Sequence, residues 1–134
     1  PEVGNMSSTN SANPIACSAG LAVIEEIKNK KLTFESKKKG EILHSGLNKL
    51  SKKFPNLFNV YGKGLIASMI FNIQIPKIDH KLKLLVEDAM KNGLLLCYTG
   101  RESIKIGPPL TITKDAIIEA IEVIEKSINN IFYR

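Results

Sequence analysis

The most constraining feature of this sequence is a hydroxyl-rich loop that stops where a slim, apolar helix begins. Residues 7–13 read Ser-Ser-Thr-Asn-Ser-Ala-Asn, and Pro14 follows them. Asn13 suits the N-cap position because its side-chain oxygen can accept a backbone N–H, and a proline is tolerated in the first turn. The pattern predicts a helix from Pro14 to about Ile27, with few polar positions before Glu25. A helix that is apolar on all sides is normally buried on all sides, so we expect it to pack against other parts of a larger protein.

The rest of the hydrophobic pattern predicts an α+β domain. Apolar residues recur at intervals of three and four where helices are expected, and they share one face of the longest predicted strand. The predicted helices cover about 33–53, 79–91 and the stretch after Thr113, and the predicted strands cover about 57–61, 65–73, 94–98 and 103–106. Short turns join the strands in pairs, which predicts two hairpins. We therefore expect a two-layer small domain whose antiparallel-rich sheet carries its helices on one face.

Three local features refine this prediction. Gly40 and Gly46 weaken the helix at 33–53, each by about 1 kcal/mol relative to alanine, so close packing is expected at both. Residues 62–64 (Gly-Lys-Gly) predict a tight turn and not a phosphate loop, which needs a longer glycine motif, a hydroxyl residue and a following helix. Thr113 suits the N-cap of the last helix.

The net charge of +6 comes largely from lysines in residues 28–39 and 52–53. Such a patch can bind nucleic acid, but no arginine lies among these lysines and only Phe34 offers an aromatic ring for base stacking. We interpret the lysines as the solvated face of two helices and expect no nucleic-acid partner. No run of about 18 apolar residues is present, so no membrane partner is expected either. The lysine-rich surface nevertheless leaves an alternative function open, a stand-alone basic α+β module that binds RNA. A regulatory domain without a catalytic partner is a further hypothesis.

Cysteine and histidine offer no obvious site for chemistry. Cys17 and Cys97 lie far apart in apolar segments, which favours buried thiols of a cytoplasmic protein over a disulfide. His44 and His80 have no partner at ligand spacing, so no metal site is predicted. We find no nucleophile–base spacing and no carboxylate pair, and expect no catalytic residue in this chain.

Thr9, Asn13 and Pro14 resemble the Thr-x-x-x-Asn-Pro segment of the class III aminotransferases, which are pyridoxal-phosphate enzymes of fold type I. Three further segments resemble motifs of the same family in the same order, namely residues 60–65 with Tyr61 in place of an arginine, residues 92–96, and residues 104–113 with Lys105 in place of another arginine. Together they cover nearly the whole chain. The resemblance implies the C-terminal domain of such an enzyme, which agrees with the α+β pattern.

The resemblance also implies how the chain is organised. Residues 1–13 would be a loop from the large, cofactor-binding domain, helix 14–28 would link the two domains, and residues 14–134 would form the C-terminal small domain. The chain starts like the middle of a longer protein. The expected partners are the upstream large domain, a second copy in a homodimer, and a small-molecule amino donor and acceptor.

The cofactor implied by the resemblance is pyridoxal 5'-phosphate. Thr9 matches the residue that hydrogen-bonds the cofactor phosphate across the dimer interface, and Ser8 is a candidate second donor. In that family the lysine that joins the cofactor lies upstream of the Thr-x-x-x-Asn-Pro segment, so the resemblance implies that it is outside this chain, whose first lysine is Lys28. The implied reaction moves an amino group through aldimine and pyridoxamine forms. The fragment alone should be inactive.

Lys105 is the most informative departure from the family pattern. The arginine at this position commonly grips the substrate carboxylate with a planar fork, whereas lysine offers a point charge. Lys105 could hold the anion more loosely, or Arg101 could take over from the nearby turn. A substrate without an α-carboxylate and a solvent-facing lysine are the two other interpretations.

Overall fold

The structure is a computed structural model that describes Thr9 and residues 12–133. The chain divides into two compact units, Pro1–Thr33 and Phe34–Arg134, which are described separately here. Ser8, a predicted site residue, lies outside the described residues. No helix in the described part of the chain is long and apolar enough to cross a lipid bilayer.

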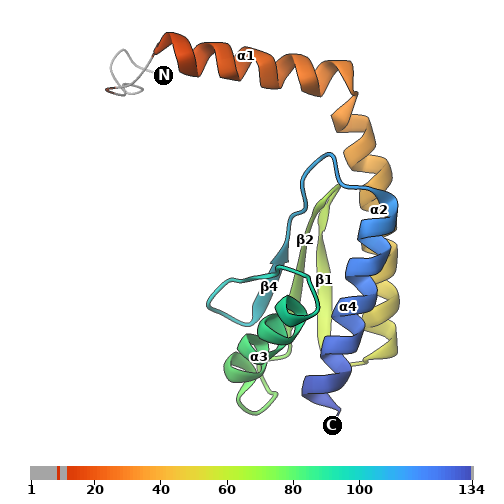
Figure 1. Cartoon of the computed structure of the whole chain (residues 1–134). Helices are drawn as coiled ribbons and strands as arrows, with labels where there is room; N and C mark the ends of the chain where they lie inside the picture. Colours follow the sequence, from red (N-terminus) through yellow and green to blue (C-terminus); the bar gives the residue numbers. More distant parts are fainter. Residues whose placement is uncertain (1–8, 10–11, 134) are drawn as a thin grey trace, which may run out of the picture. The chain divides into compact units, whose positions relative to one another are not determined.

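The first unit contains helix α1 (Pro14–Asn29), which begins where the sequence predicts (Figure 1). Asn13 Oδ1 accepts hydrogen bonds from the backbone N–H groups of Ile15 at 2.9 Å and Ala16 at 3.4 Å. None of the helix residues, all of which are described, is buried. Because its apolar side chains are exposed, the expectation that α1 packs against a larger protein stays a prediction.

The second unit is built on a four-stranded sheet with the strand order β1-β2-β4-β3. Every neighbouring pair of strands is antiparallel. The strands are β1 (Phe58–Lys63), β2 (Ile66–Phe71), β3 (Cys97–Tyr98) and β4 (Ser103–Ile106). The helices are α2 (Leu32–Lys53), all but the first two residues of which belong to this unit, α3 (Ile78–Lys91) and α4 (Lys114–Phe132). The predicted α+β fold with an antiparallel sheet is therefore confirmed.

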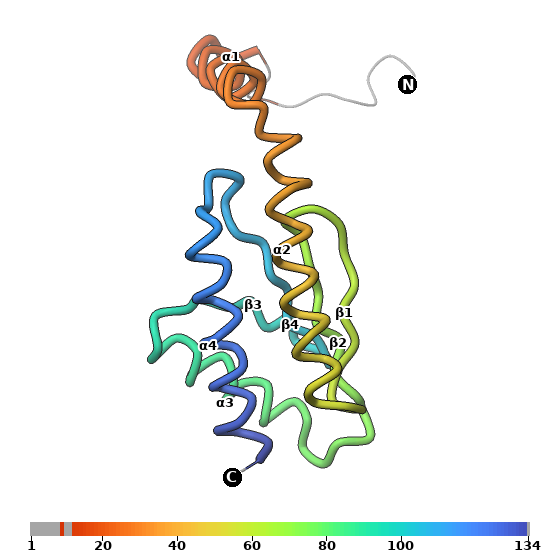
Figure 2. Tube along the Cα trace, turned by 90° about the vertical axis from the view of Figure 1, so that its right-hand side faces the viewer, coloured from red at the N-terminus to blue at the C-terminus, as the bar shows by residue number. Residues whose placement is uncertain are grey.

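The helices of this unit cover one face of the sheet, and α2 and α4 lie side by side over it (Figures 1 and 2). Along β2, Ala67, Met69 and Phe71 are buried on the helix side, where they join a single core with side chains from α2, α3 and α4. The alternate residues of β2 point to the opposite face. We call this opposite side of the sheet the open face, because its side chains are exposed or half-buried.

Both glycines of α2 mark close approaches, as the sequence predicts. A Cβ on Gly40 would lie 2.4 Å from the backbone of Gly64 in the β1–β2 turn. A Cβ on Gly46 would lie 2.2 Å from the Ile121 side chain on α4. The helix therefore contacts both the hairpin and its neighbouring helix through bare backbone.

Several boundaries differ from the prediction. Strand β2 ends at Phe71 and not at about Ile73, which is exposed, and β3 contains only Cys97 and Tyr98 of the predicted 94–98. The first hairpin turns at residues 64–65, since Lys63 still pairs with Ile66. Gly64 supplies the left-handed backbone there, with φ of 58°.

The prediction of buried thiols is wrong for the described chain, because Cys17 and Cys97 are both exposed. Cys17 lies on α1, a helix without buried residues. Cys97 lies on an edge strand, on the open face of the sheet. An apolar neighbourhood in sequence therefore did not indicate burial at either position.

Candidate functional site

The β3–β4 hairpin carries both predicted substrate-binding residues. Lys105 is an exposed residue of β4, and Arg101 is an exposed residue of the connection between β3 and β4. Thr99 closes this connection, because its Oγ1 lies 3.2 Å from the carbonyl of Ser103 and 2.8 Å from the Ser103 hydroxyl. Gly100 provides the left-handed residue of the turn, with φ of 81°. The hairpin therefore holds two cations near one edge of the sheet.

Lys105 has no counter-ion among Thr9 and residues 12–133. The ion pairs found among the described residues join Lys30 to Glu26 and Lys53 to Glu125, and neither involves Lys105. On β4 its neighbours Ile104 and Ile106 are buried on the helix side, so the alternation of the strand directs Lys105 to the open face. A lysine without a partner on an exposed sheet face can bind an anion supplied from outside.

The register of the sheet places Lys105 within one row of four side chains. Tyr61 on β1 lies opposite Ser68 on β2, Ser68 lies opposite Lys105 on β4, and Lys105 lies opposite Cys97 on β3. Directly opposed residues of antiparallel strands project from the same face. The row Tyr61–Ser68–Lys105–Cys97 therefore crosses the whole open face, with one residue from each strand.

A hydrogen bond ties the base of this hairpin to helix α3. The Tyr98 hydroxyl donates to Asp79 Oδ1 at 2.6 Å. This hydrogen bond raises the pKa of Tyr98 to about 12, and burial and the negative charges of Asp79 and Glu102 act in the same direction. Because Tyr98 stays protonated at neutral pH, it is a brace for the hairpin and not a general base.

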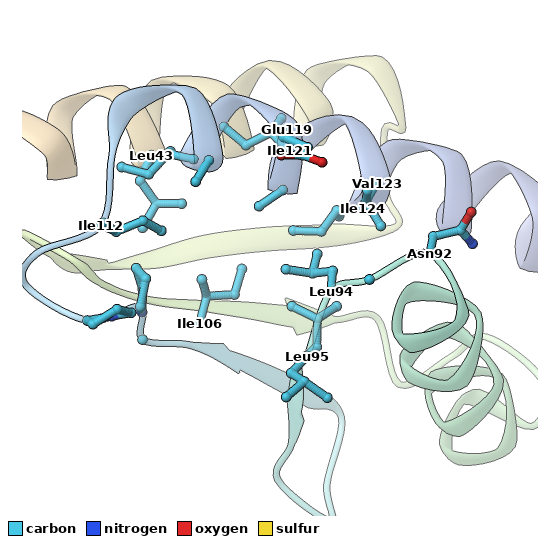
Figure 3. A pocket seen from close by; sticks show the side chains of 18 residues that line it. Leu43, Asn92, Leu94, Leu95, Ile106, Ile112, Glu119, Ile121, Val123 and Ile124 are labelled. Atoms are coloured by element: carbon cyan, nitrogen blue, oxygen red, sulfur yellow. The ribbon is translucent and has the colours of Figure 1, made fainter.

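A pocket of about 400 Å³ lies on the helix side of the sheet, between α4 and the segments that precede β3 and follow β4 (Figure 3). Leu94, Ile106, Ile112 and Ile124 point into it (Figure 3). Most of its lining is aliphatic, and Glu119 is the one ionisable side chain among the lining residues. We assign no chemistry to it.

The predicted cofactor-binding residues lie in the first unit. Thr9 is an exposed turn residue ahead of the Asn13 cap, and Ser8 is outside the described residues. Of the four predicted site residues, the structure therefore brings together only Arg101 and Lys105. Metal binding has no support among Thr9 and residues 12–133, where no three His, Cys, Asp or Glu side chains form a cluster.

Sequence reasoning missed Ser68 as a neighbour of Lys105. The alternation of buried residues along β2 was visible and already implied that Ser68 faces away from the core. The pairing of β2 with β4 was not visible, because hydrophobic periodicity does not report which strands are neighbours. Only the strand order brings Tyr61, Ser68 and Lys105 into one row.

Comparison with known proteins identifies the family. The family model described as aminotransferase class-III matches residues 1–128. An acetylornithine aminotransferase of Synechocystis sp. is 36% identical over 95% of this chain and 29% of its own length. A mitochondrial ornithine aminotransferase of Drosophila ananassae is 35% identical over 93% of this chain and 27% of its own length.

Solved structures agree with this match. The crystal structure of an acetylornithine aminotransferase from Elizabethkingia anophelis superposes with a TM-score of 0.82 and 30% identity, over 97% of this chain and 32% of the solved chain. The sequence thus spans less than a third of the relatives it matches. Since the family model extends over residues 1–128, the chain belongs to the class III aminotransferases.

Proposed function

We propose that this chain is the C-terminal part of a pyridoxal-phosphate-dependent aminotransferase that transfers an amino group between small molecules. The observation that carries the proposal is the family match over residues 1–128. We propose that the catalytic lysine lies in a large domain outside this chain, and the greater length of the relatives named above, more than three times that of this chain, supports this proposal. The complete enzyme is proposed to be a cytoplasmic homodimer.

The described residues fit a contributing role in cofactor binding. The bound cofactor would supply the electron sink that makes amino-group transfer feasible. Thr9 offers an exposed hydroxyl, and a hydroxyl donates a strong hydrogen bond to a charged phosphate. One hydroxyl cannot satisfy a phosphate dianion, so the other donors would come from the large domain. Ser8 is proposed as a second donor.

The proposed role of Lys105 is to bind the carboxylate of the substrate. Its open-face position and the lack of a carboxylate partner among the described residues support this role. Arg101 is the alternative anchor on the same hairpin, with a guanidinium that can bind both carboxylate oxygens. The relatives act, by their names, on ornithine or acetylornithine, and we propose an amino acid or related amine as the donor.

Cofactor affinity tests the role of Thr9. In the complete enzyme, Thr9→Ala should weaken cofactor binding about tenfold, since a hydrogen bond to a charged group contributes about 1.5 kcal/mol or more. Titration of the visible absorption band of the bound cofactor measures the affinity. Thr9→Ser keeps the hydroxyl and should bind nearly as well as the wild type. Equal affinity of Thr9→Ala and the wild type would remove Thr9 from the cofactor site.

Amino donors with and without a carboxylate test the role of Lys105. Lys105→Ala should raise KM for the carboxylate-bearing donor and leave KM for the corresponding amine unchanged. Lys63→Ala is the matched control, because Lys63 is an exposed cation on β1 of the same sheet. If Arg101→Ala gives the selective loss instead, Arg101 is the anchor. Equal effects of Lys105→Ala on both donors would exclude a carboxylate contact.

The RNA-binding alternative gains no support. The named relatives are aminotransferases, and no nucleic-acid-binding protein is among them. Lys37, Lys38, Lys52 and Lys53 are exposed on α2, as expected for the solvated face of a helix.

A further inference from the structure

The residues beside Lys105 on the open face offer hydroxyl groups. Ser68 is the direct cross-strand partner of Lys105, and Tyr61 is the partner of Ser68 on its other side. Adjacent strands of a sheet are about 4.8 Å apart. Two long side chains, Tyr61 and Lys105, therefore flank one short side chain, and a small anion placed above Ser68 lies within reach of all three.

We propose that Tyr61 and Ser68 act together with Lys105 as the carboxylate-recognition row of this enzyme and determine which acids it accepts. The inference rests on the proposed function, in which Lys105 binds the substrate carboxylate. It assigns two further specificity-determining residues, each of which would contact the substrate.

The chemistry of the three groups is complementary. A lysine ammonium attracts a carboxylate as a point charge and leaves its orientation open, because it lacks the planar fork of arginine. Hydroxyl groups donate directed hydrogen bonds to carboxylate oxygens. Ser68 and Tyr61 would therefore fix the orientation of the carboxylate, which Lys105 alone leaves open.

The surroundings of the row favour an aliphatic acid. On β2, Ser68 lies between Ile66 and Ile70, which project from the same face and are 61% and 38% exposed. The polar row is thus bordered on both sides by apolar side chains. A few convergent polar groups set among apolar ones are typical of a small-molecule site. We infer that the substrate presents a carboxylate to the row and methylene groups to the two isoleucines.

Two conservative substitutions test the row in the cofactor-loaded full-length enzyme. Tyr61→Phe and Ser68→Ala each remove one hydroxyl and should raise KM for an aliphatic 2-oxo acid roughly three- to tenfold, since each hydrogen bond to a carboxylate is lost. The value of kcat should change less than twofold, and KM for an aldehyde acceptor of the same length should not change. Tyr133→Phe and Ser45→Ala are the controls. Tyr133 is 57% exposed, close to the 58% of Tyr61, and Ser45 is an exposed serine on α2, away from the row.

A binding measurement independent of turnover uses Cys97, the other partner of Lys105. This thiol is exposed and can be alkylated with iodoacetamide. Glutarate, an aliphatic dicarboxylate, should slow the alkylation of Cys97 in the wild type. Tyr61→Phe and Ser68→Ala should each require about three- to tenfold more glutarate for the same protection, and Lys105→Gln should require still more.

The possible results separate the two levels of the proposal. If the full-length wild type neither binds the cofactor nor transfers amino groups, the proposed function fails and this inference fails with it. If the wild type is active but Tyr61→Phe and Ser68→Ala behave like their controls in both measurements, only the recognition row is overturned. Selective loss in Lys105→Gln alone likewise overturns the shared role of the two hydroxyls.

Discussion

Replacement of Gly40 by alanine should destabilise the domain by about 2 kcal/mol, because α2 meets the β1–β2 turn through bare backbone at this residue. A Cβ on Gly40 would lie 2.4 Å from the carbonyl carbon and oxygen of Gly64. Ordinary contact begins near 3.4 Å, so the helix and the turn must separate by about 1 Å. Overpacking of a core costs about 1–3 kcal/mol of stability. Backbone atoms cannot rotate out of the way as a side chain can, so we use the upper end of this range, about 3 kcal/mol, for the clash at Gly40. The higher helix propensity of alanine offsets about 1 kcal/mol of this cost, which leaves the net loss of about 2 kcal/mol.

Thermal and urea unfolding of the chain, followed by circular dichroism, measure this loss. A destabilisation of about 2 kcal/mol should lower Tm by about 8 °C in a chain of this size. Gly107→Ala is the control, because a Cβ there meets no atom within 4 Å, and it should change stability by less than about 0.5 kcal/mol. Gly46→Ala should fall between the two, since its clash is with the flexible end of the Ile121 side chain. If Gly40→Ala is as stable as Gly107→Ala, the inferred backbone contact is wrong.

Two further predictions concern hydrogen bonds. The hydrogen bond from Tyr98 to Asp79 raises the pKa of Tyr98 above its ordinary value of 10.0 to about 12, so its contribution to stability is complete below pH 10 and is lost as the pH rises to 12. The Tm difference between the wild type and Tyr98→Phe should accordingly shrink over this range, and a constant difference would contradict the assignment. Ser127, which is fully buried, donates to Asp88 Oδ2 at 2.8 Å, so Ser127→Ala should cost about 1.5 kcal/mol in urea unfolding. The neighbouring exposed Lys126→Ala should cost less than about 0.5 kcal/mol, and equal losses would refute a special role for the buried pair.

The sequence predicted those parts of the fold that depend on local periodicity and capping. The helical spacing of Leu43, Leu47, Leu50 and Phe54 is visible in the sequence, and all four side chains are buried in the core. Thr113 caps α4 as predicted, since its Oγ1 accepts from the N–H of Ala116 at 3.2 Å. Side chains at these positions are set by their near neighbours, and this information is present in any short window of sequence.

Features that depend on long-range pairing could not be predicted in the same way. The pairing of Ser68 with Lys105 follows from the position of β4 between β2 and β3, which no local pattern reports. The exposure of Cys97 follows from its edge position, although three leucines directly precede it in the sequence. Lys105 was found only because its segment resembles a family motif, and Arg101 because it lies in the nearby turn, and their roles stay predictions.

The row of four residues on the open face, if it recognises the substrate as proposed, has a consequence for how substrate preference would change. Each strand contributes one member, so the spacing between neighbours is fixed by the interstrand hydrogen bonds and not by loop conformation. A single substitution in this row alters the local chemistry and leaves the other three residues in place. In the role proposed above, such a surface would let the enzyme acquire a new acid preference one residue at a time, without an insertion or a change in the backbone.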